Sequence, residues 1–323
     1  MSSGAASIHM PDQVTVTLLV LGAGWTYQFL QPILERSPSI TYAATTSTGH
    51  DNTLEFRFDP DSDDLEPFKR LPLAEYVLVT FPLKGKGPSR KLVGMYAETH
   101  AGSARLERTT KWIQLGSTGV YTAAEWVDCT TPIDPSNERG IAEDELISLG
   151  GCVLNLAGLY GAQRQPGNWI PRVAKTKDQL GEKGALHLIH GIDVARAIVA
   201  VVAEEDKEKE DQRGGNAARG TDVSTLFGRR WIISDCASYD WWQIVWDFNG
   251  ESEEGVVRAD DRGTIAVPET AVTQRTHRSW VMQLMEAKGV RGLPRPPELL
   301  GRKLDGREFW ARVGLNPERT LKR

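Results

Sequence analysis

The amino-acid sequence predicts an α/β fold, in which a doubly wound parallel sheet is accompanied by a smaller C-terminal substrate lobe. Short β-branched and apolar runs alternate with stretches of helical periodicity, and a glycine turn separates the first such run from the first helical stretch. Hydrophobic residues make up 40% and charged residues 25% of the 323 residues, which is typical of a soluble globular protein. A chain of this length suffices for one large domain with a smaller lobe, or for two modest domains.

Strands and helices are predicted in alternation along the first half of the chain. Residues 14–21 are β-branched and apolar, residues 22–24 are Gly-Ala-Gly, and residues 27–34 have apolar side chains at helical spacing. The further elements are predicted strands at 39–44, 54–58, 76–81, 111–116 and 152–157, and helices over 88–108 and around 142–147. This order suits a parallel sheet with crossovers.

The same pattern predicts the domain organisation. Residues 1–13 form a flexible tail, residues 14–165 the core with the parallel sheet, and residues 166–323 a smaller lobe interleaved with the core. In the lobe the regularity weakens, and the elements predicted there are strands at 186–190 and 231–234 and a helix over 194–202.

Two polar stretches predict exposed loops. Residues 204–220 are dense in Glu, Asp, Lys, Arg and Gly without an apolar period, which predicts a mobile loop or, alternatively, a docking segment. Residues 250–263 are acidic and contain glycine, which predicts a second exposed loop before the C-terminal helices.

Overall charge and hydropathy argue against two classes of partner. The formal net charge is -5, whereas nucleic acids and anionic membranes both attract basic surfaces. No apolar run reaches the roughly 18 residues that cross a bilayer, and the first residues lack the basic flank of a secretory signal. We therefore expect a cytoplasmic protein with neither nucleic acid nor membrane as partner.

The cysteines and the paired histidines do not predict a metal site. Cys129, Cys152 and Cys236 are odd in number and widely spaced, which argues against disulfides and a thiolate zinc site. His187 and His190 lie in a predicted strand, where residues three apart point to opposite faces.

A glycine turn between a strand and a helix is typical of phosphate binding, because a helix start offers free N–H groups and partial positive charge. The turn consists of Gly22, Ala23, Gly24, Trp25 and Thr26. The dinucleotide fingerprint places a third glycine where this chain has Tyr27. Together with the ordered strands, the turn predicts a Rossmann-type unit that binds a dinucleotide through these six residues.

The end of the second strand does not choose between NAD and NADP. An acidic residue is expected about 20 residues after the turn, to bind the ribose of NAD. The sequence has Thr45, Thr46, Ser47 and Thr48 there instead. Short hydroxyl side chains suit a ribose or a 2′-phosphate, and the alternative is a plain polar turn.

Four segments resemble motifs of the extended short-chain dehydrogenases/reductases. Residues 115–121, Leu-Gly-Ser-Thr-Gly-Val-Tyr, resemble the family's S-S-T-x-V-Y-G segment. The other matching segments are Trp126-Val127-Asp128 with Thr131-Pro132 and Pro135-Ser136, then Asn155 to Gly161, and Leu188 to Ala197. They resemble the family's W-V-D-E-x-x-P-x-x-P, R-x-x-x-x-Y-G and I-H-V-x-D-V-A-x-A motifs. The resemblance covers about residues 14–240 and indicates the atypical, NAD(P)-dependent epimerase/dehydratase-like branch.

The resemblance implies further cofactor contacts. Asp59 lies where proteins of the family contact the edge of the adenine ring. Thr80, Phe81 and Pro82 lie where their chain runs under the cofactor. The lysines of the following loop, Lys84 and Lys86, lie near phosphate or substrate, or are simply solvated. The implied cofactor is NAD or NADP, the implied partner a small-molecule substrate, and a homodimer is common in the family.

The family's catalytic Tyr-x-x-x-Lys pair is missing. In that pair the lysine lowers the pKa of the tyrosine, which exchanges a proton with a carbonyl or hydroxyl group. Ser117 aligns with the family's serine, but the tyrosine place falls near Asn137 and the lysine place near Ile141.

A displaced tyrosine is the remaining candidate for the catalytic acid. Tyr121 or Tyr160 is that acid, with Arg139 or a lysine lowering its pKa, or both are walls of the cofactor pocket. We take Ser117 and Tyr121 as the candidate catalytic residues.

The resemblance implies that the family's substrate loop lies just after Gln165-Pro166-Gly167. Asn168, Trp169 and Arg172 suit the binding of a polar ligand, with the indole as an apolar face. Trp241 and Trp242 are expected to pack the second lobe.

Two hypotheses of function follow. The first is an NAD(P)-dependent oxidoreductase or epimerase-like protein that acts on a small polar metabolite. The second is a non-catalytic NAD(P)-binding sensor or scaffold. We favour the first.

Overall fold

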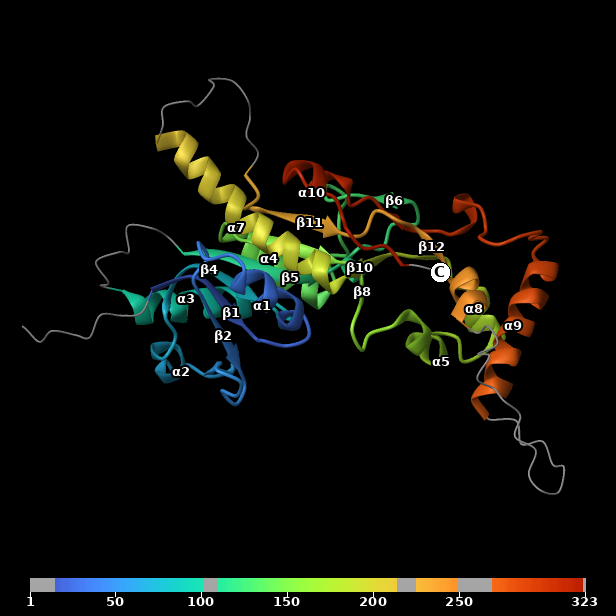
Figure 1. The fold of residues 1–323 in the computed structure, drawn as a ribbon, viewed down its shortest axis with the longest axis horizontal. Helices are drawn as coiled ribbons and strands as arrows, with labels where there is room; N and C mark the ends of the chain where they lie inside the picture. The colour runs from blue at the N-terminus through green and yellow to red at the C-terminus, as the bar shows by residue number, and fades with distance from the viewer. Residues whose placement is uncertain (1–14, 102–109, 214–224, 249–268, 322–323) are drawn as a thin grey trace, which may run out of the picture. The chain divides into compact units, whose positions relative to one another are not determined.

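The computed structural model describes residues 15–101, 110–213, 225–248 and 269–321, shown as coloured ribbon in Figure 1. The described chain forms two compact units, each built from three segments. Of the described residues, unit 1 comprises those within 15–120, 133–155 and 194–231, and unit 2 those within 121–132, 156–193 and 232–321. The predicted tail 1–13 and the predicted loop 250–263 lie outside the described residues.

Unit 1 contains a seven-stranded sheet, six strands of which correspond to those predicted for the core, whereas the seventh, β11, corresponds to the strand at 231–234 that was expected in the smaller lobe. Its strands, in spatial order, are β11 (Arg229–Ile233), β7 (Cys152–Leu156), β5 (Lys111–Ser117), β4 (Leu73–Val79), β1 (Thr15–Leu21), β2 (Tyr42–Thr46) and β3 (Leu54–Glu55). Strand β1 pairs in parallel with β2 and β4, and β4 pairs in parallel with β5. Residues 18–21 of β1 are fully buried, as expected of a central parallel strand covered on both faces. This is a Rossmann-type doubly wound fold.

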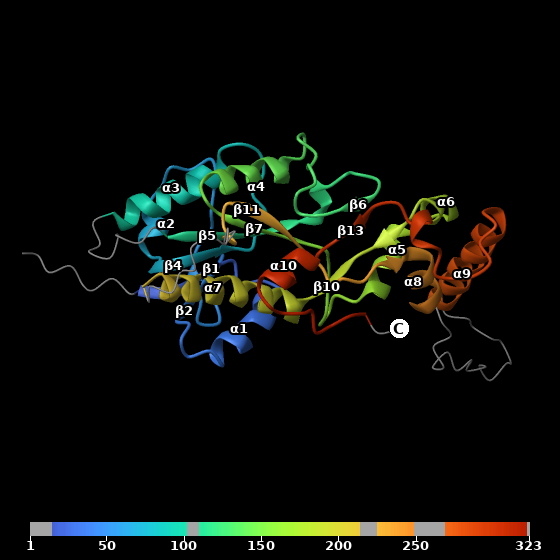
Figure 2. The same cartoon turned by 90° about the horizontal axis from the view of Figure 1, so that it is seen from above.

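Helices cover both faces of this sheet. They are α1 (Tyr27–Glu35), α2 (Glu66–Lys69), α3 (Pro88–His100), α4 (Glu138–Ser148) and α7 (Gly191–Arg213). Figure 2 shows α3 and α4 on one face of the sheet and α1 and α7 on the other. The first face has a continuous core, in which Leu92 and Met95 of α3 and Leu146 of α4 pack against Val77 and Trp112 of the sheet.

Helix α7 corrects one expectation of the sequence analysis. It continues to Arg213, so residues 204–213 are helical and not part of a loop. The physical reason is that Glu, Lys, Gln and Arg have high intrinsic helix propensity, so a helix already formed over 191–203 can extend without an apolar face. The rest of the expected loop, 214–220, lies outside the described residues.

Unit 2 is built from short elements. Its two-stranded sheets pair β8 (Gly158–Tyr160) with β10 (Leu188–His190), β9 (Ala185–Leu186) with β12 (Tyr239–Asp240), and β6 (Trp126–Val127) with β13 (Lys303–Leu304). Its helices are α5 (Ile170–Val173), α6 (Lys177–Gly181), α8 (Trp241–Phe248), α9 (Glu269–Ala287) and α10 (Arg307–Arg312). Short 3₁₀ turns of unit 2 lie at Pro166–Trp169 and Pro297–Leu299, and a further one, Thr118–Val120, follows β5 in unit 1.

Tryptophans pack the core of unit 2, as predicted. The side chain of Trp242 is fully buried among residues of α5, α6 and α9, and Trp241 is 9% exposed in a neighbouring cluster. The indole N–H of Trp242 donates to the carbonyl oxygen of Leu180 at 2.9 Å. A buried indole needs such an acceptor, because its N–H loses water on burial.

The paired histidines have separate structural partners. Nε2 of His187 accepts a hydrogen bond from the amide of Leu304, and Nδ1 of His190 accepts one from the amide of Ile192. Over the described ranges, no group of three or more His, Cys, Asp and Glu is arranged to hold a metal ion. Likewise, no described helix is both long and apolar enough to span a bilayer.

Candidate functional site

The glycine turn after β1 is fixed by side chains from two neighbouring strands. The amide of Gly22 donates to the Thr45 hydroxyl at 3.1 Å, and the Thr80 hydroxyl donates to the carbonyl oxygen of Gly22 at 2.6 Å. Gly22 has a φ of +95°, and a Cβ there would lie 2.6 Å from Oγ1 of Thr80. The structure thus brings together three predicted cofactor residues, and it explains why glycine is required at position 22.

The turn leads directly into the first turn of α1. The amide of Ala23 donates to the carbonyl oxygen of Thr45 at 2.6 Å, and that of Gly24 to Gly22 at 2.8 Å. Thr26 is the N-cap of α1, and its side chain makes no capping hydrogen bond. Apart from Gly24 and its two chain neighbours, no described residue has a heavy atom within 4 Å of a Cβ built on Gly24. A pyrophosphate can therefore approach the backbone at Gly24, next to the positive end of the helix.

Two aromatic residues of the turn are held by their own helix. The ring of Trp25 packs edge-on against Phe29, with 4.9 Å between centroids. Burial, and to a smaller extent the neighbouring Tyr42 and Glu35, raises the pKa of Tyr27 to about 12. Tyr27 therefore stays protonated near neutral pH and suits packing better than proton transfer.

The hydroxyl residues after β2 divide into structural and exposed positions. Thr45 is 1% exposed and supports the glycine turn, a role that sequence analysis did not anticipate. Oγ1 of Thr46 lies 2.7 Å from Oγ1 of Thr53 and accepts from the amide of Gly49. Ser47 is exposed. The contact of these residues with a ribose stays a prediction.

An aromatic pair lies between two residues that the sequence predicts to contact the cofactor, Gly22 and Asp59. Phe81, next to Gly22, stacks with Phe58 at 6.4 Å between centroids, and Phe58 directly precedes Asp59. The Asp59 carboxylate is exposed and accepts from the amide of Asp61. The sequence places Phe58 at the end of a predicted strand and does not indicate its contact with Phe81.

The loop after β4 leaves its polar side chains in solvent. Pro82, Lys84 and Lys86 are exposed. No hydrogen bond joins either lysine ammonium group to another described residue, so the solvated interpretation fits the structure without a ligand.

Ser117 ends β5 beside a buried carboxylate. Its amide donates to Oε1 of Glu143 at 3.2 Å, and its hydroxyl accepts from the amide of Gly119 at 3.1 Å. Oε2 of Glu143 accepts from Nδ2 of Asn155 at 2.7 Å and from Nη1 of Arg230 at 3.2 Å. We call Glu143, Asn155 and Arg230 the Glu143 cluster. Through its hydrogen bond to the Ser117 amide, this cluster holds the backbone at Ser117 in place.

Burial dominates the electrostatics of the Glu143 cluster. The Glu143 side chain is 0% exposed, and this burial raises the pKa of the carboxyl group, while Asn155, Arg230 and Arg139 oppose the rise. A Cβ at Gly116 would lie 2.5 Å from Nδ2 of Asn155 and 2.6 Å from Oε1 of Glu143. Sequence reasoning missed the cluster, because its three residues come from α4, β7 and β11.

Asn137, which lies near the expected place of the catalytic tyrosine, has a structural role. Asn137 is the N-cap of α4, and its side-chain oxygen accepts from the amides of Arg139 and Gly140. Residues 133–150 contain no tyrosine and no lysine, and Arg139 is their sole basic residue. The guanidinium of Arg139 donates to the carbonyl oxygen of Leu115 at 3.4 Å, two residues before Ser117.

The candidate tyrosines belong to unit 2 and are buried. Tyr121 is 0% exposed and Tyr160 is 6% exposed. Burial first, and then the carboxylates of Asp235 and Asp193, raises the pKa of Tyr160. Such a phenol gives up its proton less readily than a free tyrosine, which argues against a role for Tyr160 as catalytic acid.

The predicted substrate residues lie at the start of α5 in unit 2. Trp169 packs partly against the cluster around Tyr160 and Trp241. Asn168 and Arg172 are exposed, and Nδ2 of Asn168 donates to the carbonyl oxygen of Gln163 at 3.5 Å. These two side chains are thus accessible to a ligand of unit 2.

Comparison with known proteins identifies the fold. No family model matches the chain, and no curated protein matches its sequence. Among solved structures, MoeE5 in complex with UDP-glucose and NAD is 16% identical, with a TM-score of 0.53 and 94% of each chain covered. The dTDP-glucose 4,6-dehydratase of Bacillus anthracis in complex with NAD is 13% identical, with a TM-score of 0.51 over 94% of this chain and 92% of that chain.

A reductase shares the same arrangement. Yeast methylglyoxal/isovaleraldehyde reductase Gre2, complexed with NADPH, is 13% identical, with a TM-score of 0.50 and 94% of each chain covered. At these identities the similarity concerns the fold. The chain therefore shares its fold with these solved structures, and this is the Rossmann-type α/β fold that the sequence predicts.

Proposed function

We propose that this chain binds NAD or NADP at the glycine turn of unit 1 and acts as an oxidoreductase or epimerase-like protein on a small polar metabolite. The observation that carries the proposal is the turn itself. Gly22 is fixed by hydroxyl groups at the ends of β2 and β4, and the turn opens onto the N-terminus of α1. The carboxyl ends of parallel strands around such a turn are where open α/β sheets bind their ligands.

Ser117 supports a reaction close to that cofactor site. It ends β5, whose neighbour β4 leads to Thr80 at the turn. In the proposed reaction the Ser117 hydroxyl hydrogen-bonds the carbonyl or hydroxyl group of the substrate, while the Glu143 cluster holds the Ser117 backbone in place. The nicotinamide ring, when bound, supplies hydride chemistry.

A titration of the purified protein with NADH and NADPH, followed by energy transfer from tryptophan, tests cofactor binding. Gly24→Glu places a negative charge where the pyrophosphate approaches, without a clash inside the protein, and we expect it to weaken binding by at least about tenfold. Gly94→Glu in α3 is the matched control, because Gly94 is equally open and lies in the same unit. Equal binding by both variants would reject the turn as the cofactor site.

The absence of tyrosine and lysine from residues 133–150 favours a second candidate, a non-catalytic NAD(P)-binding sensor or scaffold. A screen of carbonyl and hydroxy compounds with the bound cofactor separates the two. We expect turnover that falls at least about tenfold in Ser117→Ala, in line with the usual size of a hydrogen-bond contribution to catalysis. Cofactor binding without turnover of any compound would favour the sensor.

A further inference from the structure

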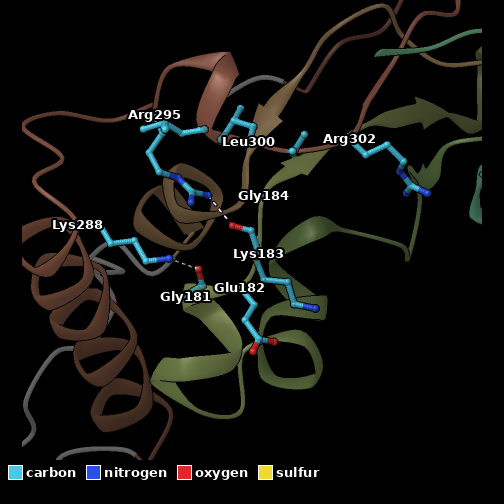
Figure 3. Close-up of a pocket in the computed structure, with 11 residues that line it drawn as sticks. Gly181, Glu182, Lys183, Gly184, Lys288, Arg295, Leu300 and Arg302 are labelled. Atoms are coloured by element: carbon cyan, nitrogen blue, oxygen red, sulfur yellow. Dashed lines mark hydrogen bonds between the residues drawn. The ribbon is translucent and has the colours of Figure 1, made fainter. Parts of the chain in front are cut away.

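Unit 2 contains a cavity that none of the predicted site residues lines. Its volume is about 490 Å³, within the range of about 300–1,000 Å³ that is usual for small-molecule sites. Residues 181–185, from the end of α6 to β9, form one wall, and residues 299–302 form another. Lys288 and Arg295 complete the lining (Figure 3).

The two walls are joined closely by their backbones. The amide of Ala185 donates to the carbonyl oxygen of Leu300 at 2.7 Å. A Cβ on Gly184 would lie 2.1 Å from the same oxygen, so this approach requires glycine. The cavity is therefore a built feature of unit 2 and not a gap between loosely placed loops.

Positive charge predominates in the lining. The ionisable residues of the lining are Glu182, Lys183, Lys288, Arg295 and Arg302. Even with Arg295 neutralised by its ion pair to Asp240, three cations stand against one carboxylate. This local excess contrasts with the net charge of -5 of the whole chain.

The pKa of His187 is lowered in part by two cations of this region. After burial, which is the largest cause, the charges of Arg302 and Lys303 help to lower the pKa of His187 to about 4. The positive potential that disfavours the protonated imidazole of His187 also attracts an anion into the cavity.

Arg295 is a preorganised donor in this lining. Its side chain is 5% exposed and stacks on Trp242, with 3.8 Å between the guanidinium carbon and the ring centroid. Nε and Nη2 donate to Asp240, and Nη2 also donates to the carbonyl oxygen of Lys183 at 2.7 Å. No described residue accepts from Nη1, so two N–H groups of a rigid guanidinium stay available.

Lysines add mobile donors. Nζ of Lys288 donates to the carbonyl oxygen of Gly181 at 2.9 Å, which uses one of its three N–H groups. Nζ of Lys183 has no hydrogen-bond acceptor among the described residues. Figure 3 shows Lys288 and Arg295 directed towards the 181–184 backbone, with the guanidinium group of Arg302 well separated from them. Arg302 thus contributes at longer range.

We propose that this cavity binds a phosphate-bearing small molecule. Arg295 Nη1 and Lys288 Nζ donate hydrogen bonds to the phosphate oxygens, and Lys183 and Arg302 add electrostatic attraction. Several cations around one fixed guanidinium favour an oxyanion with more than one negative charge over a single carboxylate. The proposal is independent of cofactor binding in unit 1.

Isothermal titration calorimetry with pyrophosphate tests the proposal, with the Gly24→Glu background used throughout so that the glycine turn cannot supply the signal. In this background we expect Lys288→Glu to raise the dissociation constant by at least about tenfold. Lys175→Glu is the matched control, because Lys175 is exposed, belongs to unit 2 and does not line the cavity. We expect the control to change the constant by less than about twofold.

Three outcomes overturn the proposal: no heat of binding up to about 10 mM pyrophosphate, an unchanged constant in Lys288→Glu, or an equal loss in Lys288→Glu and Lys175→Glu. Thermal melting is the control for folding, because it shows whether the Lys288→Glu variant is still folded. If it is not, Lys183→Glu decides the question by the same criteria, because no described residue depends on the Lys183 ammonium group. Titration with inorganic phosphate and with a phosphate monoester then distinguishes free phosphate from an organic phosphate as ligand.

Discussion

At the scale of single residues, the Glu143 cluster contains a buried ion pair between Glu143 and Arg230. Oε2 of Glu143 lies 3.2 Å from Nη1 of Arg230, whose side chain is 9% exposed. Without Glu143, Arg230 keeps as its ion-pair partner among the described residues only Asp144, whose side chain is 60% exposed. Loss of a partner from a buried pair costs far more than loss of an exposed pair. The Ser117 backbone depends on the same carboxylate.

We therefore expect Glu143→Ala to lower the free energy of unfolding by about 3–5 kcal/mol. Asp144→Ala is the matched control, because Asp144 also pairs with Arg230 but its side chain is 60% exposed, and we expect it to cost at most about 1 kcal/mol. Urea unfolding, monitored by tryptophan fluorescence, gives both values. Equal costs for the two variants would contradict a buried role for Glu143.

Asp235 in unit 2 makes stability depend on pH. Burial raises the pKa of its carboxyl group from 3.8 to about 6, against the opposing hydrogen bond from the Tyr239 hydroxyl at 2.6 Å. Because the folded pKa lies above the unfolded one, the contribution to stability is complete below about pH 4 and is lost as the pH rises through about 6.

We expect Asp235→Asn to remove this dependence. Between about pH 4 and about pH 7, the free energy of unfolding of the parent should fall relative to that of the variant by on the order of 2 kcal/mol. The comparison must be made between the two proteins, because His187, whose pKa is lowered to about 4, acts in the opposite direction in both. Urea unfolding at several pH values gives the free energy of unfolding of both proteins. If it changes with pH in the same way in both, Asp235 is not the source of the pH dependence.

At the scale of elements, α4 depends on its cap. The side chain of Asn137 accepts from two amides of the first turn, which have no partner inside the helix. We expect Asn137→Ala to cost about 1 kcal/mol of stability, and Asn137→Asp to retain most of it because the carboxylate accepts the same hydrogen bonds. Thermal unfolding of the three proteins measures this, and an equal loss in both variants would show that the side-chain acceptor at position 137 is not what stabilises α4.

The sequence predicted the order of the sheet elements better than their ends. The strand expected at 76–81 ends at Val79, because Thr80 turns its hydroxyl to the carbonyl oxygens of Leu21 and Gly22. The strand expected at 54–58 is formed only over Leu54–Glu55. Apolar and β-branched runs identify strands, whereas the ends depend on tertiary hydrogen bonds that a sequence pattern does not contain.

For the candidate site, the sequence predicted the glycine turn but not the residues that support it. Glycines after an apolar strand have a known signature, so the turn at Gly22 could be predicted. The support that Thr45 and Thr80 give to this turn, and the contact of Glu143 with Arg230, join residues far apart in the sequence. Such contacts have no local pattern and become visible only in the folded chain.

At the scale of the whole molecule, cofactor binding should stabilise the units unequally. A ligand at about 100 times its dissociation constant adds about 2.7 kcal/mol to the free energy of unfolding. We expect NADH to slow amide hydrogen exchange at residues 20–30 and 42–46 of unit 1, and to leave residues 276–300 of unit 2 unchanged. Hydrogen exchange with mass spectrometry measures this, with Gly24→Glu as the control, and slowed exchange in that variant would place binding elsewhere.

The alternation of the two units along the chain also bears on biosynthesis. Unit 1 ends only at Trp231, and its edge strand β11 spans Arg229–Ile233, so 233 of the 323 residues must leave the ribosome before the seven-stranded sheet can be completed. During that time β7 offers an unpaired edge to other chains. Neither unit is encoded by a continuous stretch, so a shortened gene cannot yield either of them alone, and a nascent chain that stalls before Arg229 is the form most exposed to aggregation.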